Sequence, residues 1–203
     1  MNIIVRLENE RDYRKVEEIT REAFNDPAYP GRDKKNDIGC PFEHWMVHTL
    51  RERDGIRELS YVAEVDGKIV GHIIYSEAYV KTQEGKRVQV LNLGPLSVLP
   101  VQQRRGVGKA LLMETFIQAK KLGYGAILFF GRPEYYPQFG FVQAVNFGIT
   151  ACNGINYPEL MAMELKSGYL DNIKGKYYES PIYNDSNNKK AVKEYDELFN
   201  SVF

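Results

Sequence analysis

A short run of arginines and glycines near the middle of the chain has the residue types and spacing of a phosphate-binding segment. It lies between an apolar, strand-like stretch and an amphipathic, helix-like stretch, and it comprises Gln103, Arg104, Arg105, Gly106, Val107 and Gly108. Glycine lets the backbone approach a ligand because it has no Cβ, and the first turn of a helix offers unpaired N–H groups at the positive end of its dipole. The pattern predicts a helix N-terminus that holds a pyrophosphate.

Other glycine-rich phosphate motifs do not fit this segment. A P-loop would need glycine at Gln103 and a hydroxyl residue at Ala110, and a dinucleotide-binding fingerprint would need glycine at Leu111. A kinase glycine-rich loop would require later catalytic-loop motifs that the sequence lacks. The alternative that stays open is a strand-to-helix turn that uses glycine only for its geometry.

Two ordered motifs resemble the GNAT superfamily of acyl-CoA-dependent N-acetyltransferases. The first resembles motif A of that family and reads Val98-Leu99-Pro100, two further residues, then Gln103-x-x-Gly106-x-Gly108-Lys109-Ala110-Leu111-Leu112. The second resembles motif B, a tyrosine four residues before a Gly-Phe pair, in Tyr135-Tyr136-Pro137-Gln138-Phe139-Gly140-Phe141. The resemblance covers roughly residues 3–150. The amino-acid sequence at residues 94–96 and 134–137 is most similar to that of the YhbS-like branch.

The resemblance implies a site for acetyl-CoA as cosubstrate, with no metal. It implies that the backbone of residues 104–109 cradles the pyrophosphate, that strand residues pair with the pantetheine arm, and that the same strand offers an N–H group to the thioester oxygen. The implied contacts are Leu96, Ser97, Val98, Gln103, Arg104, Arg105, Gly106, Val107, Gly108 and Lys109. Tyr136 matches the general acid that protonates the departing thiolate, with Tyr135 as its local competitor, and Pro137 departs from the family pattern.

The general base is left open by the sequence. Glu77, Asn92 as a water-positioning group, Glu134 or a water relay each remain candidates. His44 and His48 have the spacing of a metal pair, but no third ligand is evident, and His72 is expected to be a hydrogen-bonded residue of a strand. Asp26, Asp33 and Asp37 are expected to be solvated charges in a loop, with attraction of a cationic amine as the alternative.

Composition sets limits on the class of protein. The chain has 203 residues, of which 43% are hydrophobic, and 27 basic side chains balance 27 acidic ones. This balance gives no electrostatic case for nucleic acid or an anionic membrane as a partner. Cys40 and Cys152 have no metal or redox spacing, and the N-terminus has no secretory or membrane-spanning pattern, so the expectation is a cytoplasmic protein.

Periodicity predicts a mixed α/β fold, a central twisted mixed sheet flanked by helices, in agreement with the GNAT-like fold that the resemblance implies. Strands are expected at 3–7, 59–65, 68–80, 88–99 and 126–130, with two further strands at 147–151 and 160–165. Helices are expected at 11–24, 42–53 and 107–122, the last with Leu111, Leu112, Phe116, Ala119 and Leu122 toward the core. Asp66-Gly67 predicts a hairpin, and Gly94-Pro95 favours a bulge or local splaying within the strand at 88–99, which is expected to run parallel to 126–130.

The domain prediction is a catalytic core at residues 1–150 and a C-terminal extension at 151–203. Within the extension, 184–190 is expected to be a linker or helix cap before an amphipathic helix, which should pack on its own domain in preference to a homodimer or partner contact. The predicted activity is acetyl transfer to a primary amine of a small molecule or peptide. A non-catalytic sensor of CoA and a transferase with a longer acyl donor or an O-acceptor are the alternatives. The acceptor is not specified, and its site is expected in the loop at 25–41 and the region after Phe141.

Overall fold

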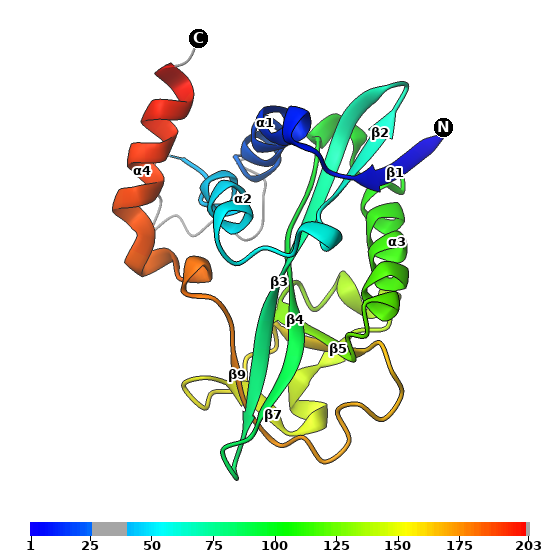
Figure 1. Ribbon diagram of the computed structural model, residues 1–203, viewed down its shortest axis with the longest axis vertical. Coiled ribbons are helices and arrows are strands. Elements are labelled where there is room, and N and C mark those ends of the chain that lie inside the picture. The colour runs from blue at the N-terminus through cyan, green and yellow to red at the C-terminus, as the bar shows by residue number, and fades with distance from the viewer. Residues whose placement is uncertain (26–39, 202–203) are drawn as a thin grey trace. The chain divides into compact units, whose positions relative to one another are not determined.

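The computed structural model describes residues 1–25 and 40–201 (Figure 1). Its α-helices are α1 (Tyr13–Phe24), α2 (Glu43–Glu52), α3 (Val107–Lys121) and α4 (Asp185–Ser201). Its strands are β1 (Ile3–Leu7), β2 (Tyr61–Val65), β3 (Lys68–Thr82), β4 (Arg87–Val98), β5 (Ala126–Phe130), β6 (Val142–Gln143), β7 (Ile149–Ala151), β8 (Leu160–Glu164) and β9 (Gly175–Tyr178). Short 3₁₀ helices are η1 (Glu10–Asp12), η2 (Arg57–Leu59), η3 (Pro100–Gln102), η4 (Tyr136–Phe139), η5 (Ala144–Phe147) and η6 (Pro181–Tyr183).

The chain forms two compact units. Unit 1 consists of Met1–Ile74, Pro95–Thr115 and Pro181–Phe203, and unit 2 consists of Tyr75–Gly94 and Phe116–Ser180. The elements β3, β4 and α3 supply residues to both units. No helix in the described residues is long and apolar enough to cross a membrane.

In unit 1 an antiparallel set of strands begins the sheet. β1 pairs with β2 along its whole length, from Ile3 opposite Val65 to Leu7 opposite Tyr61, and β2 pairs with the start of β3. The connecting residues Asp66 and Gly67 have φ values of 51° and 71°. Two successive left-handed residues give a turn whose twist matches that of the strands, so the predicted hairpin is confirmed.

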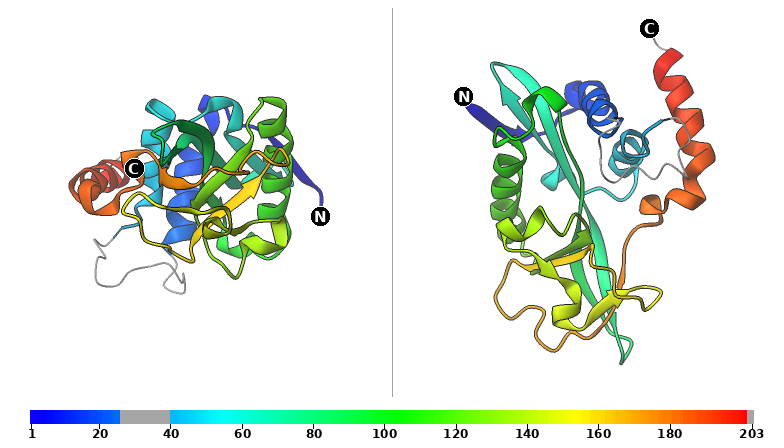
Figure 2. Two further views of the ribbon diagram at one scale, coloured as in Figure 1. Left: turned by 90° about the horizontal axis from the view of Figure 1, so that it is seen from below. Right: turned by 180° about the vertical axis from the view of Figure 1, so that it is seen from behind.

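The helices of unit 1 pack on an apolar core. α1 and α2 lie side by side (Figure 1), and α4 lies alongside α2 (Figure 2). The core is shared by α1, α2, β2, β3 and α4 and contains Val16, Trp45, Met46, Val47, Leu50, Val62, Ile74, Ile182 and Val192. The inner face of α4 therefore packs on its own chain, as its apolar spacing predicts.

The asparagine-rich segment at 184–190 is not a linker. Asn184 caps α4, because its side-chain oxygen accepts the N–H of Asn187 at 3.1 Å, and the helix continues from Asp185 onward. The amide of Asn188 donates back to the carbonyl of Asn184 at 2.9 Å. Of the two readings offered for this segment, the helix cap is confirmed and the linker is wrong.

α3 ends as its sequence predicts, with one correction. Leu111, Leu112, Phe116 and Ala119 are buried, but Leu122 is exposed. α3 stops at Lys121, and Gly123 has a φ of 90°, so the chain turns away before Leu122 can reach the core. The glycine stop signal is right, and the apolar face was extended one residue too far.

In unit 2 the sheet becomes mixed. β5 is parallel to β4 and antiparallel to β8 along its whole length, and β6 adds to the far edge of β8. On the other side, β9 pairs with the second half of β3, and β7 is parallel to β9. The predicted strands after Phe141 correspond to β7 and β8, although Phe147 belongs to η5.

β4 runs through Gly94-Pro95 without ending. Gly94 has a φ of 131°, a conformation that L side chains rarely adopt, so the backbone is irregular at this residue. This local irregularity within a continuous strand agrees with the bulge or local splaying that Gly94-Pro95 favours. The mixed α/β sheet with flanking helices is confirmed.

Candidate active site

The predicted phosphate-binding segment forms the turn that leads into α3. Arg104 and Gly106 have φ values of 59° and 89°. Ala110 donates its N–H to the carbonyl of Gly106 at 2.9 Å, while the amides of residues 104–109 make no hydrogen bond within the part of the chain that the structure describes. Six successive amides at the positive end of a helix are suited to binding an anion.

The surroundings of this turn leave room for a ligand. A Cβ on Gly106 would meet only Ile3 Cδ1, at 3.9 Å, so the backbone surface is open. Arg104, Arg105 and Lys109 are exposed and add positive charge beside the amides. The residues present therefore fit a pyrophosphate group.

A close contact fixes the first turn of α3 against β3. A Cβ on Gly71 would lie 2.9 Å from Val107 Cγ1 and 3.3 Å from Leu111 Cδ1, so only glycine allows this approach. Gln103 contributes to the same fixation, since its side-chain amide donates to the carbonyl of Val98 at 3.1 Å and its backbone N–H donates to Pro100 at 3.2 Å. The groups of Gln103 thus hold the turn, whereas the following amides stay available.

The strand residues predicted to bind the pantetheine arm lie at the end of β4. Leu96 and Val98 are half-buried, and Ser97 is buried. The Ser97 hydroxyl forms a hydrogen bond with the Thr20 hydroxyl at 2.9 Å, which ties β4 to α1. The side chain of Ser97 therefore has a structural contact, and a ligand contact there would use its backbone.

Tyr136 is held among aromatic rings in unit 2. Its ring makes edge contacts with Phe129 at 4.6 Å and Phe141 at 5.7 Å between centroids. A Cβ on Gly131 would lie 2.7 Å from the Tyr136 ring, so this glycine makes room for it. Tyr136 begins η4, in which Pro137 is tolerated in the first turn. Burial raises the pKa of the neighbouring Tyr135 phenol.

β4 and β5 separate soon after they meet. On the edge of β5 that faces β8, Leu165 donates its N–H to the carbonyl of Gly125, and Gly131 donates its N–H to the carbonyl of Glu159, both at 2.8 Å. Backbone groups alternate between the two edges of a strand, so Leu128 faces β4. Within unit 2, however, β4 pairs with β5 at a single position, Leu91 opposite Ile127.

A side chain from β9 occupies the edge of β5 that faces β4, at Leu128. The Leu128 carbonyl accepts the Tyr177 hydroxyl at 2.9 Å in place of a strand partner. Tyr177 Oη also lies 3.3 Å from Glu179 Oε2, and Asn92 Nδ2 donates to that same oxygen at 3.1 Å. Asn92, Tyr177 and Glu179 therefore form a polar cluster at the position where β4 leaves β5.

Among the candidates for the general base, only Asn92 belongs to this cluster, and its amide binds a carboxylate that the sequence did not indicate. Glu77 is exposed and accepts hydrogen bonds from Gln89 at 2.8 Å and Tyr124 at 3.4 Å, and Glu134 is exposed. Glu179 was missed because no motif surrounds it and 87 positions separate it from Asn92.

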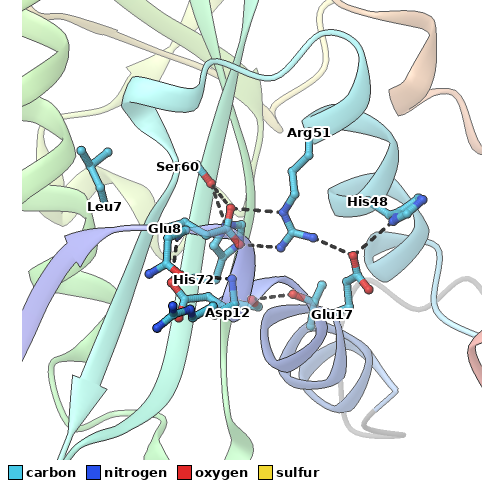
Figure 3. A network of polar contacts seen from close by, with 12 residues as sticks. Leu7, Glu8, Asp12, Glu17, His48, Arg51, Ser60 and His72 are labelled. Carbon is cyan, nitrogen blue, oxygen red and sulfur yellow. Dashed lines mark hydrogen bonds and ion pairs between the residues drawn. The ribbon is translucent and has the colours of Figure 1, made fainter. Parts of the chain in front are cut away.

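Two of the three histidines, His48 and His72, belong to a polar network in unit 1 (Figure 3). His48 contacts Glu17 at 3.2 Å, whereas His44 binds the carbonyl of Pro41 at 2.8 Å and His72 binds the hydroxyl of Ser60 at 3.0 Å. In residues 1–25 and 40–201, no three metal-ligating side chains gather. Asp26, Asp33 and Asp37, considered for binding a cationic amine, lie outside the described residues.

Comparison with known proteins adds family relationships to this geometry. Residues 13–141 match the family model described as the acetyltransferase (GNAT) family. The Escherichia coli K12 protein called uncharacterized N-acetyltransferase YjhQ is 32% identical over 105 residues, which span 51% of this chain and 58% of that protein.

Two solved structures share the fold. Escherichia coli YhbS, a GNAT family N-acetyltransferase in complex with CoA, has a TM-score of 0.76 and 22% identity, with 91% of this chain and 93% of that chain covered. A GNAT family acetyltransferase from Brucella melitensis in complex with acetyl-CoA has a TM-score of 0.66 and 25% identity, with 90% and 99% covered. The resemblance drawn from the two motifs and the fold class are both confirmed.

Proposed function

Because its residues 13–141 match the family model, the chain belongs to the GNAT family of acetyltransferases, and we propose that it transfers an acetyl group from acetyl-CoA directly to a primary amine. The observation that carries this proposal is the run of six amides at residues 104–109. We take residues 1–150 as the catalytic core and 151–203 as an extension that completes the domain. A cytoplasmic location remains an expectation from the sequence.

The chain's own groups account for holding the cosubstrate. The amides of residues 104–109 would bind the pyrophosphate, with Arg104, Arg105 and Lys109 as nearby charges. The backbone of Leu96, Ser97 and Val98 would pair with the amide-bearing pantetheine arm, as an added strand pairs with an edge. The pairing of β4 with β5 at Leu91 opposite Ile127 alone, within unit 2, supports this arrangement, since a long regular ladder between the two strands would compete with a ligand for the edge of β4.

Tyr136 would serve as the general acid. A phenol can give its proton to a thiolate leaving group, and the edge contacts with Phe129 and Phe141 restrict the ring to one orientation. Acetyl-CoA itself supplies the activated thioester. The protein's contribution is to orient it, to stabilise the carbonyl oxygen with an N–H of β4, and to protonate the sulfur.

Calorimetry with CoA and acetyl-CoA, followed by thiol release against a panel of amines, tests the proposal. Gly108→Asp places a carboxylate at the phosphate seat and should abolish binding, whereas Gly108→Ala adds a Cβ without a charge and should weaken CoA binding less than Gly108→Asp does. Tight CoA binding by a folded Gly108→Asp variant would place the site elsewhere. CoA binding with no thiol release for any acceptor would favour a sensor of CoA over an enzyme.

A further inference from the structure

Two lysines face each other on an exposed face of the sheet in unit 2, next to a pair of stacked tyrosines. β9 pairs antiparallel with the second half of β3, and the two strands lie side by side (Figure 1). In this register Lys81 lies opposite Lys176, and Tyr79 lies opposite Tyr178. We propose that these four side chains form a binding site for a phosphate monoester. The site shares no residue with the turn proposed for the pyrophosphate, and the proposal does not depend on acetyl transfer.

All four side chains lie on the same face of this strand pair. Side chains alternate between the two faces of a strand, so Tyr79 and Lys81 share one face of β3, and Lys176 and Tyr178 share one face of β9. The burial agrees with this assignment. Val80 is buried in the core of unit 2, whereas both lysines are exposed and both tyrosines are half-buried. The polar ends of the four residues are therefore accessible to a ligand.

The two lysines oppose each other without a carboxylate between them. Residues directly opposite in an antiparallel pair have Cα atoms about 4.5–5.5 Å apart, and like charges at such positions repel each other. The side chains of Lys81 and Lys176 form no ion pair or hydrogen bond with any residue among 1–25 and 40–201. The described part of the chain therefore leaves this repulsion without compensation. A dianion bound between the two ammonium groups would compensate it.

The neighbouring charges extend this positive surface. In residues 77–89 and 174–178, five side chains are basic and two are acidic, although the whole chain has 27 of each kind. The basic residues are Lys81, Lys86, Arg87, Lys174 and Lys176, and the acidic residues are Glu77 and Glu84. Glu77 accepts hydrogen bonds from Gln89 at 2.8 Å and Tyr124 at 3.4 Å. The local excess of positive charge attracts an anion to this part of unit 2.

The two tyrosines are held by stacking and offer neutral donors beside the lysines. The rings of Tyr79 and Tyr178 stack with their centroids 5.2 Å apart and 8° between their planes. The guanidinium of Arg87 lies over the ring of Tyr79, 4.6 Å from its centroid. Neither tyrosine hydroxyl has a hydrogen-bond partner in the described residues, so each can donate to a ligand oxygen.

A glycine brings the two strands together at the lysine pair. Gly175 precedes Lys176 and lies opposite Thr82 in the ladder. A Cβ on Gly175 would clash with the carbonyl of Lys81 and would lie 3.0 Å from Thr82 Cα, so glycine is required for this close approach. The sheet therefore fixes the backbone from which both lysines project.

The charge and size of the site favour one phosphate group over a polymer. Two ammonium groups match a phosphate monoester, whose charge is about −1.5 to −2 at pH 7, whereas a carboxylate supplies a single charge. Successive residues on one face of a strand are about 7 Å apart, so the two residue pairs cover the area of one phosphate group and its substituent. The next residue on this face of β3 is Glu77, an exposed carboxylate that would repel an extended polyanion.

Titration with phenyl phosphate, followed through backbone amide signals by two-dimensional NMR, tests the proposal. CoA is added to saturation, so that the turn at residues 104–109 is occupied if the proposed function is right. Phenyl phosphate should shift the signals of residues 79–82 and 175–178. It should bind about tenfold or more tightly than phenylacetate, which has a ring and one charge. Binding should weaken below about pH 6, because the phosphate monoester then takes up a proton.

Single substitutions measure the contribution of each kind of donor. Lys81→Gln and Lys176→Gln should each weaken the binding of phenyl phosphate about tenfold or more, because each removes a charged donor. Tyr178→Phe should weaken it about threefold, since a neutral donor contributes less than a charged one. Lys120→Gln is the matched control. It changes an exposed lysine of α3 in the same unit and should leave the dissociation constant unchanged.

Thermal denaturation provides a second readout. Phenyl phosphate should raise the Tm of the wild type but not that of the double variant Lys81→Gln/Lys176→Gln. Without ligand, the double variant should be at least as stable as the wild type, because it removes a repulsion. Undetectable binding, shifts confined to residues 104–109, or lysine variants within about twofold of the wild type would overturn the proposal. Those results would leave the proposed acetyl transfer intact, whereas a failure to bind CoA would contradict the proposed function and leave this site to be judged from its own signals.

Discussion

Replacing Arg51 with methionine removes the cation that holds two buried carboxylates in the network of Figure 3. Arg51 binds Glu8 through two nitrogens, at 2.5 and 3.1 Å, and Glu17 through a third at 2.6 Å. The side chains of Arg51, Glu8 and Glu17 are only 7%, 2% and 7% exposed, so water cannot replace the lost partner. Removing one partner of a buried ion pair costs about 3–5 kcal/mol. Since Ser60 still donates to Glu8 at 2.6 Å, we expect Arg51→Met to lower the free energy of unfolding by about 3 kcal/mol.

Urea denaturation of the variant and the wild type measures this loss, and thermal denaturation should show a fall in Tm of about 6–12 °C for a chain of this size. Arg57→Met is the matched control, because Arg57 is 75% exposed and lies 4.0 Å from the exposed Glu10. An exposed ion pair contributes about 0–1 kcal/mol, so the control should differ little from the wild type. Converting Glu8 and Glu17 to glutamine in the Arg51→Met background should restore part of the stability. If Arg51→Met is no less stable than Arg57→Met, the network does not stabilise the fold in the way argued here.

Two further predictions concern catalysis and pH. Tyr136→Phe should keep CoA affinity but lower kcat by about a hundredfold or more, because it removes the general acid. Tyr135→Phe, the control, should leave kcat near the wild-type value. Equal effects of the two changes on steady-state turnover would remove Tyr136 from its assigned role. The hydrogen bond that His48 donates to the Glu17 carboxylate raises the pKa of His48 above its ordinary value of 6.5. A raised pKa contributes stability that is present below the unfolded pKa and is lost as pH rises through the folded pKa. The difference in free energy of unfolding between the wild type and His48→Gln should therefore be larger at about pH 6 than at about pH 8.5, and a difference that grows with pH would contradict this assignment.

Local signals in the sequence predicted the elements well where one or two residues decide the backbone. Asp66-Gly67 takes the left-handed conformations that the hairpin requires, and Gly123 stops α3 by the same means. The apolar periods of α1, α2 and α3 also located those helices, because each period reflects one face turned toward a core. The errors occurred at Leu122, where apolar periodicity alone was used, and in the segment 184–190, where polar composition left a linker as one of two alternatives. Whether a polar, asparagine-rich stretch forms a helix depends on the tertiary packing of the apolar residues that follow it, such as Val192.

The sequence predicted some residues of the candidate site and missed others, for the same reason. The turn proposed for the pyrophosphate could be predicted, because the amides of residues 104–109 are consecutive and their geometry follows from Gly106 and the start of α3. The position of Glu179 could not be predicted from the sequence, because it depends on which residues of β9 lie opposite β3. The observed register places Tyr178 opposite Tyr79 and Tyr177 opposite Val80, and it is this register that brings the Tyr177 hydroxyl to Leu128 and Glu179 to Asn92. A slip of one residue would turn every side chain of β9 to the opposite face and would separate the Tyr177 hydroxyl from Leu128. The contact of Glu179 with Asn92 therefore depends on the pairing of strands that are distant in the sequence, whereas the turn before α3 depends on a contiguous motif.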